Sequence, residues 1–334
     1  MDGFIPLEDH LAGWSAGDSD RAALVELVIA ISGAGRAIGA LLAQGPLAGD
    51  SEARQSALPG KAVDIMQAAI SKSGAAYVTS EHLAAPIEIA AGAPFAVTLD
   101  NFSERALEAA ATCGTIFSIM PAAGDAESTY RQPGTRLLAA GYFIYGPHVA
   151  LVLTLGQGTN IYTLDPSSGR FRLTRAKVEI PRRTREFEIN ASNSRHWSDP
   201  VRAYIADCIS GAEGPRGEDY NMRWTGSLVG ACHRILSRGG LYLYPSDDRP
   251  GLARGRLHLV PEASPMAFII EQAHGLATNG VDRILDIAPS NALHRTPLVF
   301  GSRNEVERIV RYKTDRHSIS ERQPLFGQRG LFRT

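Results

Sequence analysis

The sequence predicts an α/β protein whose helices and sheets pack in layers, and three patterns along the chain indicate this class. Apolar residues recur at helical spacing in five segments, residues 18–44, 61–71, 200–209, 227–238 and 265–275. Short β-prone runs lie outside these segments, at residues 76–79, 95–99, 114–119, 137–144, 149–155, 159–164 and 170–174. The last four runs are spaced by turns, as in an antiparallel meander. Strands and helices mixed in this way indicate stacked α/β layers.

The first predicted helix contains a glycine-rich stretch, Gly33-Ala-Gly-Arg-Ala-Ile-Gly39, which we interpret as a packing surface. The stretch does not fit the nucleotide-binding pattern GxGxxG, because position 38 is Ile and no predicted strand precedes it. Small residues instead allow a neighbouring element to approach the helix closely. Either Ser19 or Asp20 is expected to cap this helix.

A polar connector, Pro181-Arg-Arg-Thr-Arg185, is expected to separate an N-terminal domain, residues 1–180, from a C-terminal domain, residues 181–334. Beyond the connector we expect three further strands and a last helix, at residues 241–244, 284–287, 297–300 and 304–312. The mixture of strands and helices thus continues into the C-terminal domain.

The overall charge argues against a polyanionic partner. The chain of 334 residues carries 34 Lys and Arg against 35 Asp and Glu, so no global positive field attracts nucleic acid or an anionic membrane. We therefore expect neither as a partner. An enzyme that binds phosphate needs only local positive charge, so this balance does not exclude one.

The N-terminus and the cysteines indicate a cytoplasmic protein. The first residues, Met1-Asp-Gly-Phe-Ile-Pro, carry an acid where a signal peptide carries bases. The apolar stretch of residues 22–43 is interrupted by Glu26 and Arg36, which makes it a poor membrane span. An odd number of cysteines without a CxxC pair favours free thiols in a reducing compartment, at Cys113, Cys208 and Cys232.

Glu262 is a good candidate for a metal ligand. It lies between a β-prone run, residues 256–260, and a helix that Pro265 begins, so its side chain can project into a cleft at a helix N-terminus. A glutamate in that place is more often a helix-start acid favoured by the dipole. The metal role is instead implied by a resemblance that the segment Glu262-Ala-Ser-Pro-Met-Ala-Phe268 carries.

This segment belongs to a longer resemblance. Together with Arg223-Trp-Thr-Gly-Ser227 and Gly239-Gly-Leu-Tyr-Leu-Tyr-Pro245, it resembles the C-terminal half of class 1 fructose-1,6-bisphosphatases, and the likeness extends over residues 114–311. The resemblance implies the layered α/β/α/β/α sandwich of sugar phosphatases, with mixed sheets, assembled as a homo-oligomer (dimer or tetramer). It also implies hydrolysis of the 1-phosphate of fructose 1,6-bisphosphate, in gluconeogenesis or the Calvin cycle, with sedoheptulose bisphosphate as an alternative substrate.

Several residues match positions at which the family binds its substrate. The resemblance implies that the sugar phosphate is held by four side chains, Asn190, Arg223, Tyr244 and Arg256. Arg256 stands where the family usually has Lys, which conserves the charge with a different geometry. Trp224 replaces the usual Tyr and removes a hydroxyl. In some members the residue matching Arg223 reaches into the neighbouring subunit's site.

The N-terminal metal loop departs from the family pattern. The family reads Asp-Pro-Leu-Asp-Gly-Ser-Ser-Asn, whereas this chain reads Val97-Thr-Leu-Asp-Asn-Phe-Ser-Glu104. The resemblance implies that Asp100 and the carbonyl of Leu99 bind metal, beside Glu262. It places the substrate phosphate at the segment Asp100-Asn101-Phe102-Ser103. A Phe side chain could crowd a phosphate nest, and Val97 cannot ligate a cation.

A second acidic motif supplies the remaining candidates. Thr79-Ser-Glu-His82 resembles the family's Ser-Glu-Glu, so Glu81 is expected to bind metal and, with Asp100, to act in catalysis. Mg²⁺ is the expected ion because it prefers oxygen ligands. Mn²⁺ and Zn²⁺ are alternatives, because His82 replaces the second acid of the motif.

The altered loop leaves three explanations open. The chain is an active bisphosphatase with a rearranged metal site, or a catalytically impaired homologue that acts as a sugar-phosphate-binding or subunit protein, or a sequence misread over about residues 51–112. An inositol-phosphate phosphatase is a weaker alternative, because such enzymes share the metal loop and lack the pattern from Tyr244 to Met266.

Overall fold

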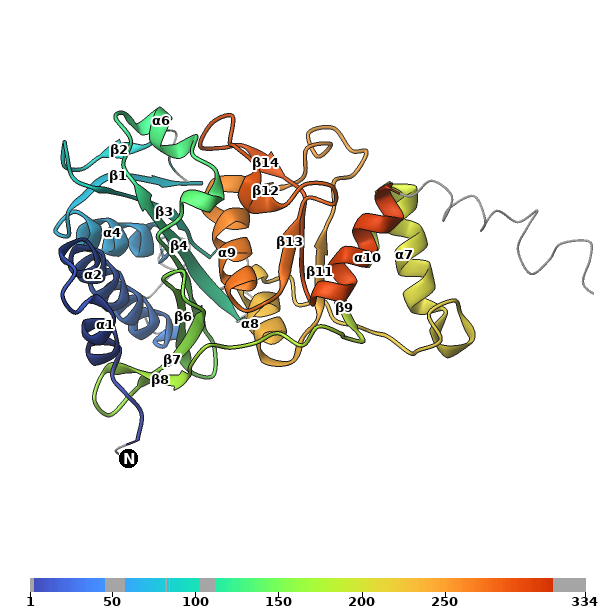
Figure 1. Ribbon diagram of the computed structural model, residues 1–334, viewed down its shortest axis with the longest axis horizontal. Helices are drawn as coiled ribbons and strands as arrows, with labels where there is room; N and C mark the ends of the chain where they lie inside the picture. Colours follow the sequence, from blue (N-terminus) through green and yellow to red (C-terminus); the bar gives the residue numbers. More distant parts are fainter. Residues whose placement is uncertain (1–2, 46–57, 82, 84, 103–111, 315–334) are drawn as a thin grey trace, which may run out of the picture.

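The computed structural model describes residues 3–45, 58–81, 83, 85–102 and 112–314, and these residues form five layers. In Figure 1 the layers follow one another from left to right as helices, sheet, helices, sheet and helices. Both sheets contain parallel and antiparallel pairs. The predicted α/β/α/β/α sandwich with mixed sheets is therefore confirmed.

The first layer consists of α1 (Leu7–Ser15), α2 (Ser19–Leu42) and α4 (Leu58–Ile70). The N-cap of α2 is Asp18, whose carboxylate accepts hydrogen bonds from the backbone N–H groups of Asp20 and Arg21. The cap therefore lies one residue before Ser19, the first of the two predicted caps. α1 was not expected from the sequence. It contributes only Leu7 and Leu11 to the core, so its periodic signal is short.

The second layer is an eight-stranded sheet in the order β2-β1-β3-β4-β5-β6-β7-β8. β1 and β3 are parallel, and the other neighbouring pairs are antiparallel. All seven strands predicted between residues 76 and 174 are present. The bounds are β1 Ala75–Ser80, β2 Ile87–Glu88, β3 Phe95–Asp100, β4 Cys113–Pro121, β5 Ala139–Tyr145, β6 Val149–Thr154, β7 Thr159–Asp165 and β8 Arg170–Arg175.

The middle layer holds α8 (Leu228–Arg238) and α9 (Ser264–Gln272), which pack between the two sheets. The second sheet has the order β10-β9-β11-β15-β13. Its strands are β9 Glu186–Glu188, β10 Asn221–Met222, β11 Leu241–Tyr244, β13 Leu276–Thr278 and β15 Leu298–Gly301. A separate two-stranded ribbon pairs β12 (Leu257–His258) with β14 (Arg295–Thr296).

The last layer consists of α7 (Asp199–Ile209) and α10 (Arg303–Thr314), which cover the outer face of the second sheet. One predicted strand is wrong: residues 284–287 contain a 3-10 turn, Ile284–Asp286. The ion pair between Arg283 and Asp286, three residues apart, fits a helical turn rather than a strand. Ile284 and Leu285 of that turn are both buried. The sequence therefore lacked the alternation of buried and exposed residues that would have distinguished a strand from a 3-10 turn.

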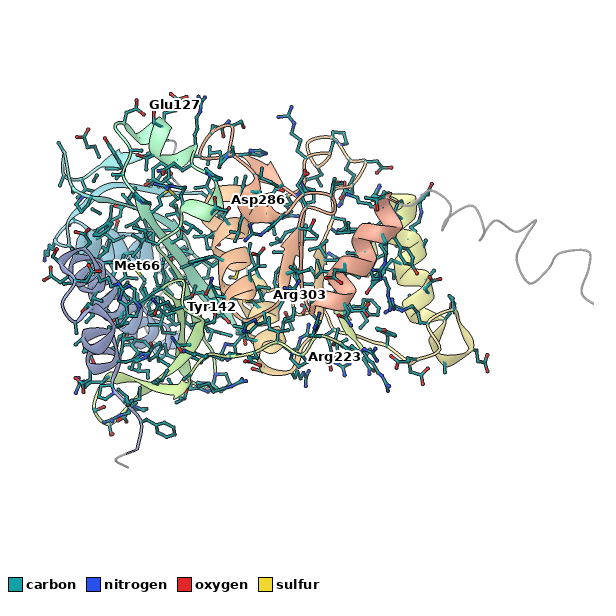
Figure 2. All side chains as sticks on the ribbon, in the orientation of Figure 1. Met66, Glu127, Tyr142, Arg223, Asp286 and Arg303 are labelled. Carbon is teal, nitrogen blue, oxygen red and sulfur yellow. The ribbon has the colours of Figure 1, made fainter. Side chains whose placement is uncertain are left out.

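Separate apolar cores fill the spaces between the layers. Met66 of α4 belongs to the core between the helices of the first layer and the large sheet. Tyr142 of β5 belongs to the core on the opposite face of that sheet, against α8, α9 and the second sheet. Figure 2 labels both side chains, one in each space. Both faces of the large sheet are therefore buried, which explains its nearly continuous apolar strands.

α2 is a core helix despite its apolar composition. Among the described residues it is the one helix long and apolar enough to cross a membrane, but 56% of its most apolar window is buried inside the protein. A Cβ at Gly35 would lie 2.4 Å from the ring of Phe143, and one at Gly39 would lie 2.9 Å from Val149. The glycine-rich stretch is a close-packing surface, as predicted.

We predict that Gly35→Ala destabilises the protein by about 1–3 kcal/mol, because the new methyl group overpacks α2 against Phe143. Gly33→Ala is the matched control in the same helix. A Cβ at Gly33 meets nothing within 4 Å, so this variant should gain about 0.5–1 kcal/mol from better helix propensity. Thermal or denaturant unfolding of the two variants measures the difference. Equal stabilities would contradict the packing interpretation.

Candidate active site

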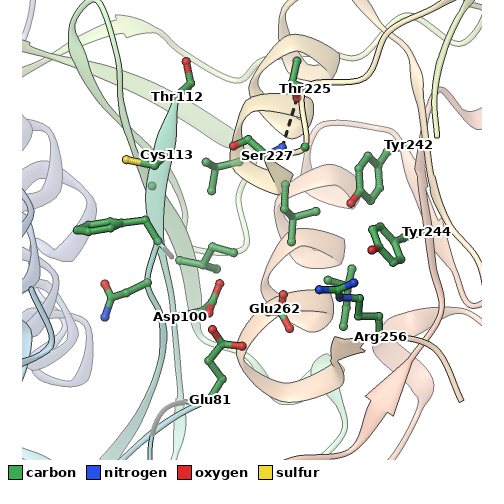
Figure 3. Close-up of a pocket in the computed structure, with 18 of the residues that line it drawn as sticks. Glu81, Asp100, Thr112, Cys113, Thr225, Ser227, Tyr242, Tyr244, Arg256 and Glu262 are labelled. Atoms are coloured by element: carbon green, nitrogen blue, oxygen red, sulfur yellow. Dashed lines mark hydrogen bonds between the residues drawn. The ribbon is translucent and has the colours of Figure 1, made fainter. Parts of the chain in front are cut away.

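A pocket of about 530 Å³ opens where the large sheet, the middle helices and the second sheet meet. Residues far apart in the sequence line it, from Glu81 to Glu262. Figure 3 shows carboxylates on its lower side and Tyr242, Tyr244 and Arg256 on its right side. The predicted site residues that line it are Glu81, Asp100, Asn101, Phe102, Tyr244, Arg256 and Glu262.

Three of these residues form a carboxylate cluster. Glu81 follows β1, Asp100 ends β3, and Glu262 lies in a π-helical turn (Leu259–Ala263) that leads into α9. The parallel pairing of β1 and β3 brings Glu81 and Asp100 to the same edge of the sheet. Burial raises the pKa of Asp100, and the charges of Glu262 and Glu81 raise this pKa further. The cluster is therefore short of positive charge.

His258 completes the cluster, and the sequence analysis did not find it. Its Nδ1 lies 3.2 Å from a carboxylate oxygen of Glu262 and 3.5 Å from one of Glu81. Its backbone N–H also donates to Glu262 at 2.6 Å, which fixes that carboxylate within the turn. Hydrogen bonds to Glu262 and Glu81 raise the pKa of His258 to about 9. Ligand atoms of Glu81, His258 and Glu262 all lie within 4.8 Å of one another.

The alternation of β3 explains how the chain tolerates Val97. Val97 and Leu99 pack in the core on the side of the first helical layer, whereas Ala96 belongs to another core and Thr98 bonds Ser118. Val97 is fully buried, and its carbonyl accepts a hydrogen bond from Tyr130. Neither Val97 nor Leu99 lines the pocket. The missing acid therefore leaves no gap beside Asp100.

The residues after Asp100 differ in where they point. Phe102 touches the pocket, but its ring also packs edge-on against Tyr145, at 6.1 Å between centroids, inside the first core. Asn101 is buried and accepts a hydrogen bond from Thr115 at 2.9 Å. Three residues of the predicted loop and acidic motif lie outside the described residues, namely His82, Ser103 and Glu104.

The opposite wall is aromatic and basic. Tyr242 and Tyr244 are two residues apart on β11, so they share the face of that strand that lines the pocket. The rings of Trp224 and Tyr244 lie 6.3 Å apart between centroids. Arg256 is exposed, and no acid of the described part of the chain forms an ion pair with it. Figure 3 shows its guanidinium group directed into the pocket.

The N-terminus of α8 forms another part of the pocket wall. Residues from Trp224 to Val229 line the pocket, and Ser227 caps the helix by accepting a hydrogen bond from Gly230 N–H. Glu188, which is fully buried, accepts two hydrogen bonds from Thr225 and pairs with Arg234 of α8. Glu188 thus holds the loop before α8 in place. A helix N-terminus favours an anionic group.

Two predicted substrate ligands do not line this pocket. Asn190 caps a 3-10 helix through a hydrogen bond to Ser192 N–H, and it lines a small adjoining hollow that also includes Tyr244. Arg223, labelled in Figure 2, is half-exposed and lies 3.8 Å from Glu186. Of the four predicted substrate ligands in the C-terminal half, the pocket therefore brings together Tyr244 and Arg256.

The pocket has the polar groups that a cation and a phosphate require. Oδ1 of Asp100 and Nδ2 of Asn101 are buried without a hydrogen-bond partner in the described structure. Such orphaned groups are costly unless a ligand satisfies them. The acceptor suits a cation, and the adjacent donor suits a phosphate oxygen. The residues therefore fit a metal ion beside a phosphate group.

This combination of fold and pocket defines a layered α/β phosphatase. Of the solved structures, a fructose-1,6-bisphosphatase from Leishmania major in holo form superposes with a TM-score of 0.86 at 28% identity, over 93% of this chain and 100% of that one. The apo form of the same protein superposes with a TM-score of 0.83.

Sequence comparisons give the family. The N-terminal domain of fructose-1-6-bisphosphatase matches residues 34–176, and the C-terminal domain matches residues 180–314. The class 1 fructose-1,6-bisphosphatase of Rhizobium meliloti is 51% identical over 259 residues, which cover 76% of this chain and 74% of the relative. The class 1 enzyme of Bradyrhizobium diazoefficiens is 42% identical over the full length of both chains. The chain belongs to the class 1 fructose-1,6-bisphosphatase family.

Proposed function

We propose that this protein hydrolyses the 1-phosphate of fructose 1,6-bisphosphate to give fructose 6-phosphate and phosphate. The observation that carries this proposal is the convergence of Glu81, Asp100 and Glu262 on a pocket whose opposite wall presents Arg256 and Tyr244. The three carboxylates suit a cation at the reacting phosphate. Arg256 and Tyr244 suit the sugar and its other phosphate.

The carboxylate cluster would hold the metal ion. Glu81, Asp100 and Glu262 supply oxygen ligands, and a bound cation polarises the phosphoryl group and makes water more acidic. The pKa of Asp100 falls once positive charge balances the cluster, so Asp100 is then ionised. We assign to the Glu81 carboxylate the acceptance of a proton from the attacking water, with Asp100 as the second catalytic carboxylate.

The remaining residues bind and orient the substrate. Arg256 binds a phosphate oxygen through its guanidinium group, and the Tyr244 hydroxyl donates to the same phosphate. Asn101 Nδ2 and the backbone at the N-terminus of α8 lie where they can bind anionic oxygens. Phe102 and Val229 form apolar wall that reduces the access of water to the reacting phosphate.

The active-enzyme explanation of the altered loop accounts best for these contacts. Residues 95–100 form a regular strand between β1 and β4, and Asp100 at its end meets Glu81 and Glu262. An impaired or misread segment has no reason to preserve that convergence. We therefore propose a rearranged metal site rather than a lost one, in which the carbonyl of Leu99 remains a proposed ligand.

The wider setting is also a proposal. We propose two domains that meet near residue 180, a cytoplasmic location, and a role in gluconeogenesis or the Calvin cycle. We also propose a homo-oligomer: Arg223 is half-exposed and does not line the pocket of its own chain, so it is free to act at the site of a neighbouring subunit, as in some members of the family.

His258 affects the choice of metal. We propose that its Nδ1 joins the carboxylates as a ligand, because it lies within 4.8 Å of ligand atoms of Glu81 and Glu262. On binding the cation, His258 would give up the proton that it otherwise holds between these two acids. Mg²⁺ remains the ion that an oxygen-rich site favours. A nitrogen ligand shifts preference toward Mn²⁺ or Zn²⁺.

The first prediction concerns Glu262. The wild-type chain should release phosphate from fructose 1,6-bisphosphate with Mg²⁺ or Mn²⁺, and Glu262→Gln should lower turnover by more than the roughly 10–100-fold lost with an outer-shell partner. Glu127→Gln is the control, because Glu127 is exposed on α6 (Ala126–Tyr130), away from the pocket. Saturable binding of the sugar phosphate without turnover would instead support the sugar-phosphate-binding alternative.

A second prediction separates binding from chemistry. Arg256→Gln should raise KM for fructose 1,6-bisphosphate about 10–100-fold, because a charge-assisted hydrogen bond is lost, and Tyr244→Phe should raise it about fivefold. In both variants kcat should change less than KM. Steady-state kinetics measure this, with the exposed Arg311→Gln as the control. An unchanged KM in Arg256→Gln would remove this residue from the substrate site.

A third prediction tests His258 as a ligand. Pulsed electron paramagnetic resonance of the Mn²⁺-bound protein should show coupling to nitrogen, and His258→Gln should abolish it. Calorimetry should show that the variant binds Mn²⁺ about tenfold more weakly, with a smaller effect on Mg²⁺. His148→Gln, at an exposed position, is the control. A spectrum without nitrogen coupling would reduce His258 to a hydrogen-bond partner of the carboxylates.

A further inference from the structure

A second cavity, of about 360 Å³, lies between the loop that precedes β12 and the loop that precedes β14. The first loop contributes Arg254, the second contributes Ser290, Asn291 and His294, and Arg295 begins β14. None of the described residues that line this cavity is acidic. It shares no lining residue with the active-site pocket, so it is a separate feature of the surface.

The positive charges around this cavity are not neutralised within the described structure. No described acid forms an ion pair with Arg254 or with Arg295. Arg295 has one described hydrogen bond, from its guanidinium group to the backbone carbonyl of Arg256 at 2.9 Å. The nearby acid Asp247 is instead paired with Arg249. Both arginines are exposed, so their guanidinium groups are available to an anion that enters the cavity.

His294 adds a neutral donor to the same cavity. Its Nδ1 lies 3.1 Å from the backbone N–H of Ser290, and this bond makes Nδ1 the acceptor. In the neutral ring the proton then resides on Nε2. Partial burial lowers the pKa of His294, and the charge of Arg254 lowers it further, which keeps the ring neutral. The cavity thus presents two charged donor groups and a neutral one.

We infer that this cavity binds a small organic anion with at least two anionic groups, a phosphorylated metabolite or a polycarboxylate. Arginine's planar fork matches both phosphate and carboxylate oxygens. The cavity is large enough for a small-molecule site and smaller than the active-site pocket. It therefore has room for a small organic anion.

The two-stranded ribbon connects this cavity to the active site. In the ribbon Arg295 of β14 is the register partner of His258 of β12, and its side chain bonds the carbonyl of Arg256. An anion held by Arg295 therefore acts on Arg256, whose carbonyl Arg295 bonds, and on its register partner His258 in β12. This coupling rests on the proposed function, under which Arg256 binds substrate, and it makes the cavity a regulatory site.

Calorimetric titration of the full-length chain tests the binding directly. Inorganic pyrophosphate is the probe in one arm and citrate in the other, both without added divalent cation because both chelate metals. At least one probe should bind, and the double variant Arg254→Gln/Arg295→Gln should weaken that binding about tenfold or more. The single variant Arg311→Gln and the active-site variant Tyr244→Phe should leave it unchanged. Binding of pyrophosphate identifies phosphate as the recognised group, and binding of citrate identifies carboxylate.

Binding of neither probe would overturn the inference, as would equal affinity in the double variant and in Arg311→Gln. Loss of binding in Tyr244→Phe would assign the anion to the active-site pocket instead. Where phosphate release is measurable, the bound anion should shift KM for fructose 1,6-bisphosphate in the wild type and not in the double variant. The titration gives its result even if the protein has no turnover, so failure of the proposed function and failure of the anion site are distinguishable.

Discussion

The repulsion among three carboxylates at the base of the pocket is the constraint on which the site depends. Asp100 lies beside Glu81 and Glu262; burial is the main cause of its raised pKa, and the charges of Glu262 and Glu81 raise this pKa further. His258 offsets part of this negative charge through its contacts with Glu81 and Glu262. The orphaned oxygen of Asp100 remains without a partner in the described structure. A fold that holds carboxylates this close stores an unfavourable energy that a bound cation relieves.

The layers around the pocket keep these groups in place. The parallel pair β1 and β3 fixes Glu81 and Asp100 at one sheet edge, and the π-helical turn before α9 directs Glu262 toward them from the middle layer. π-helical turns are rare and frequent at functional sites, because they redirect a side chain within a helix. On the opposite side, buried Glu188 fixes the loop before α8 through Thr225. The chemistry is thus assembled from rigid elements rather than from free loops.

The sequence predicted the layered fold and most of the pocket, because periodic strands and helices and the motifs around Tyr244 and Glu262 leave strong local signals. It did not predict His258, since that role depends on the π-helical turn, which brings a residue four positions before Glu262 back onto its carboxylate. The short strand β9 carries Glu188, whose partner Thr225 is 37 residues away, so only the folded chain reveals the contact. Residues 284–287 were misassigned because a buried 3-10 turn and a strand share the same apolar spacing.

The register of β3 explains why Val rather than an acid suits position 97 in this structure. A strand alternates its side chains between two faces, so Val97 points into the helix-side core while Asp100 ends the strand at the pocket. An acid at position 97 would be buried among apolar side chains in this register, and Val is the better residue there. His258 of β12 lies on the other side of the cluster, beside the carboxylates of Glu81 and Glu262. The acids that meet in the pocket therefore come from the ends of β1 and β3 and from the turn before α9, and none of them depends on position 97.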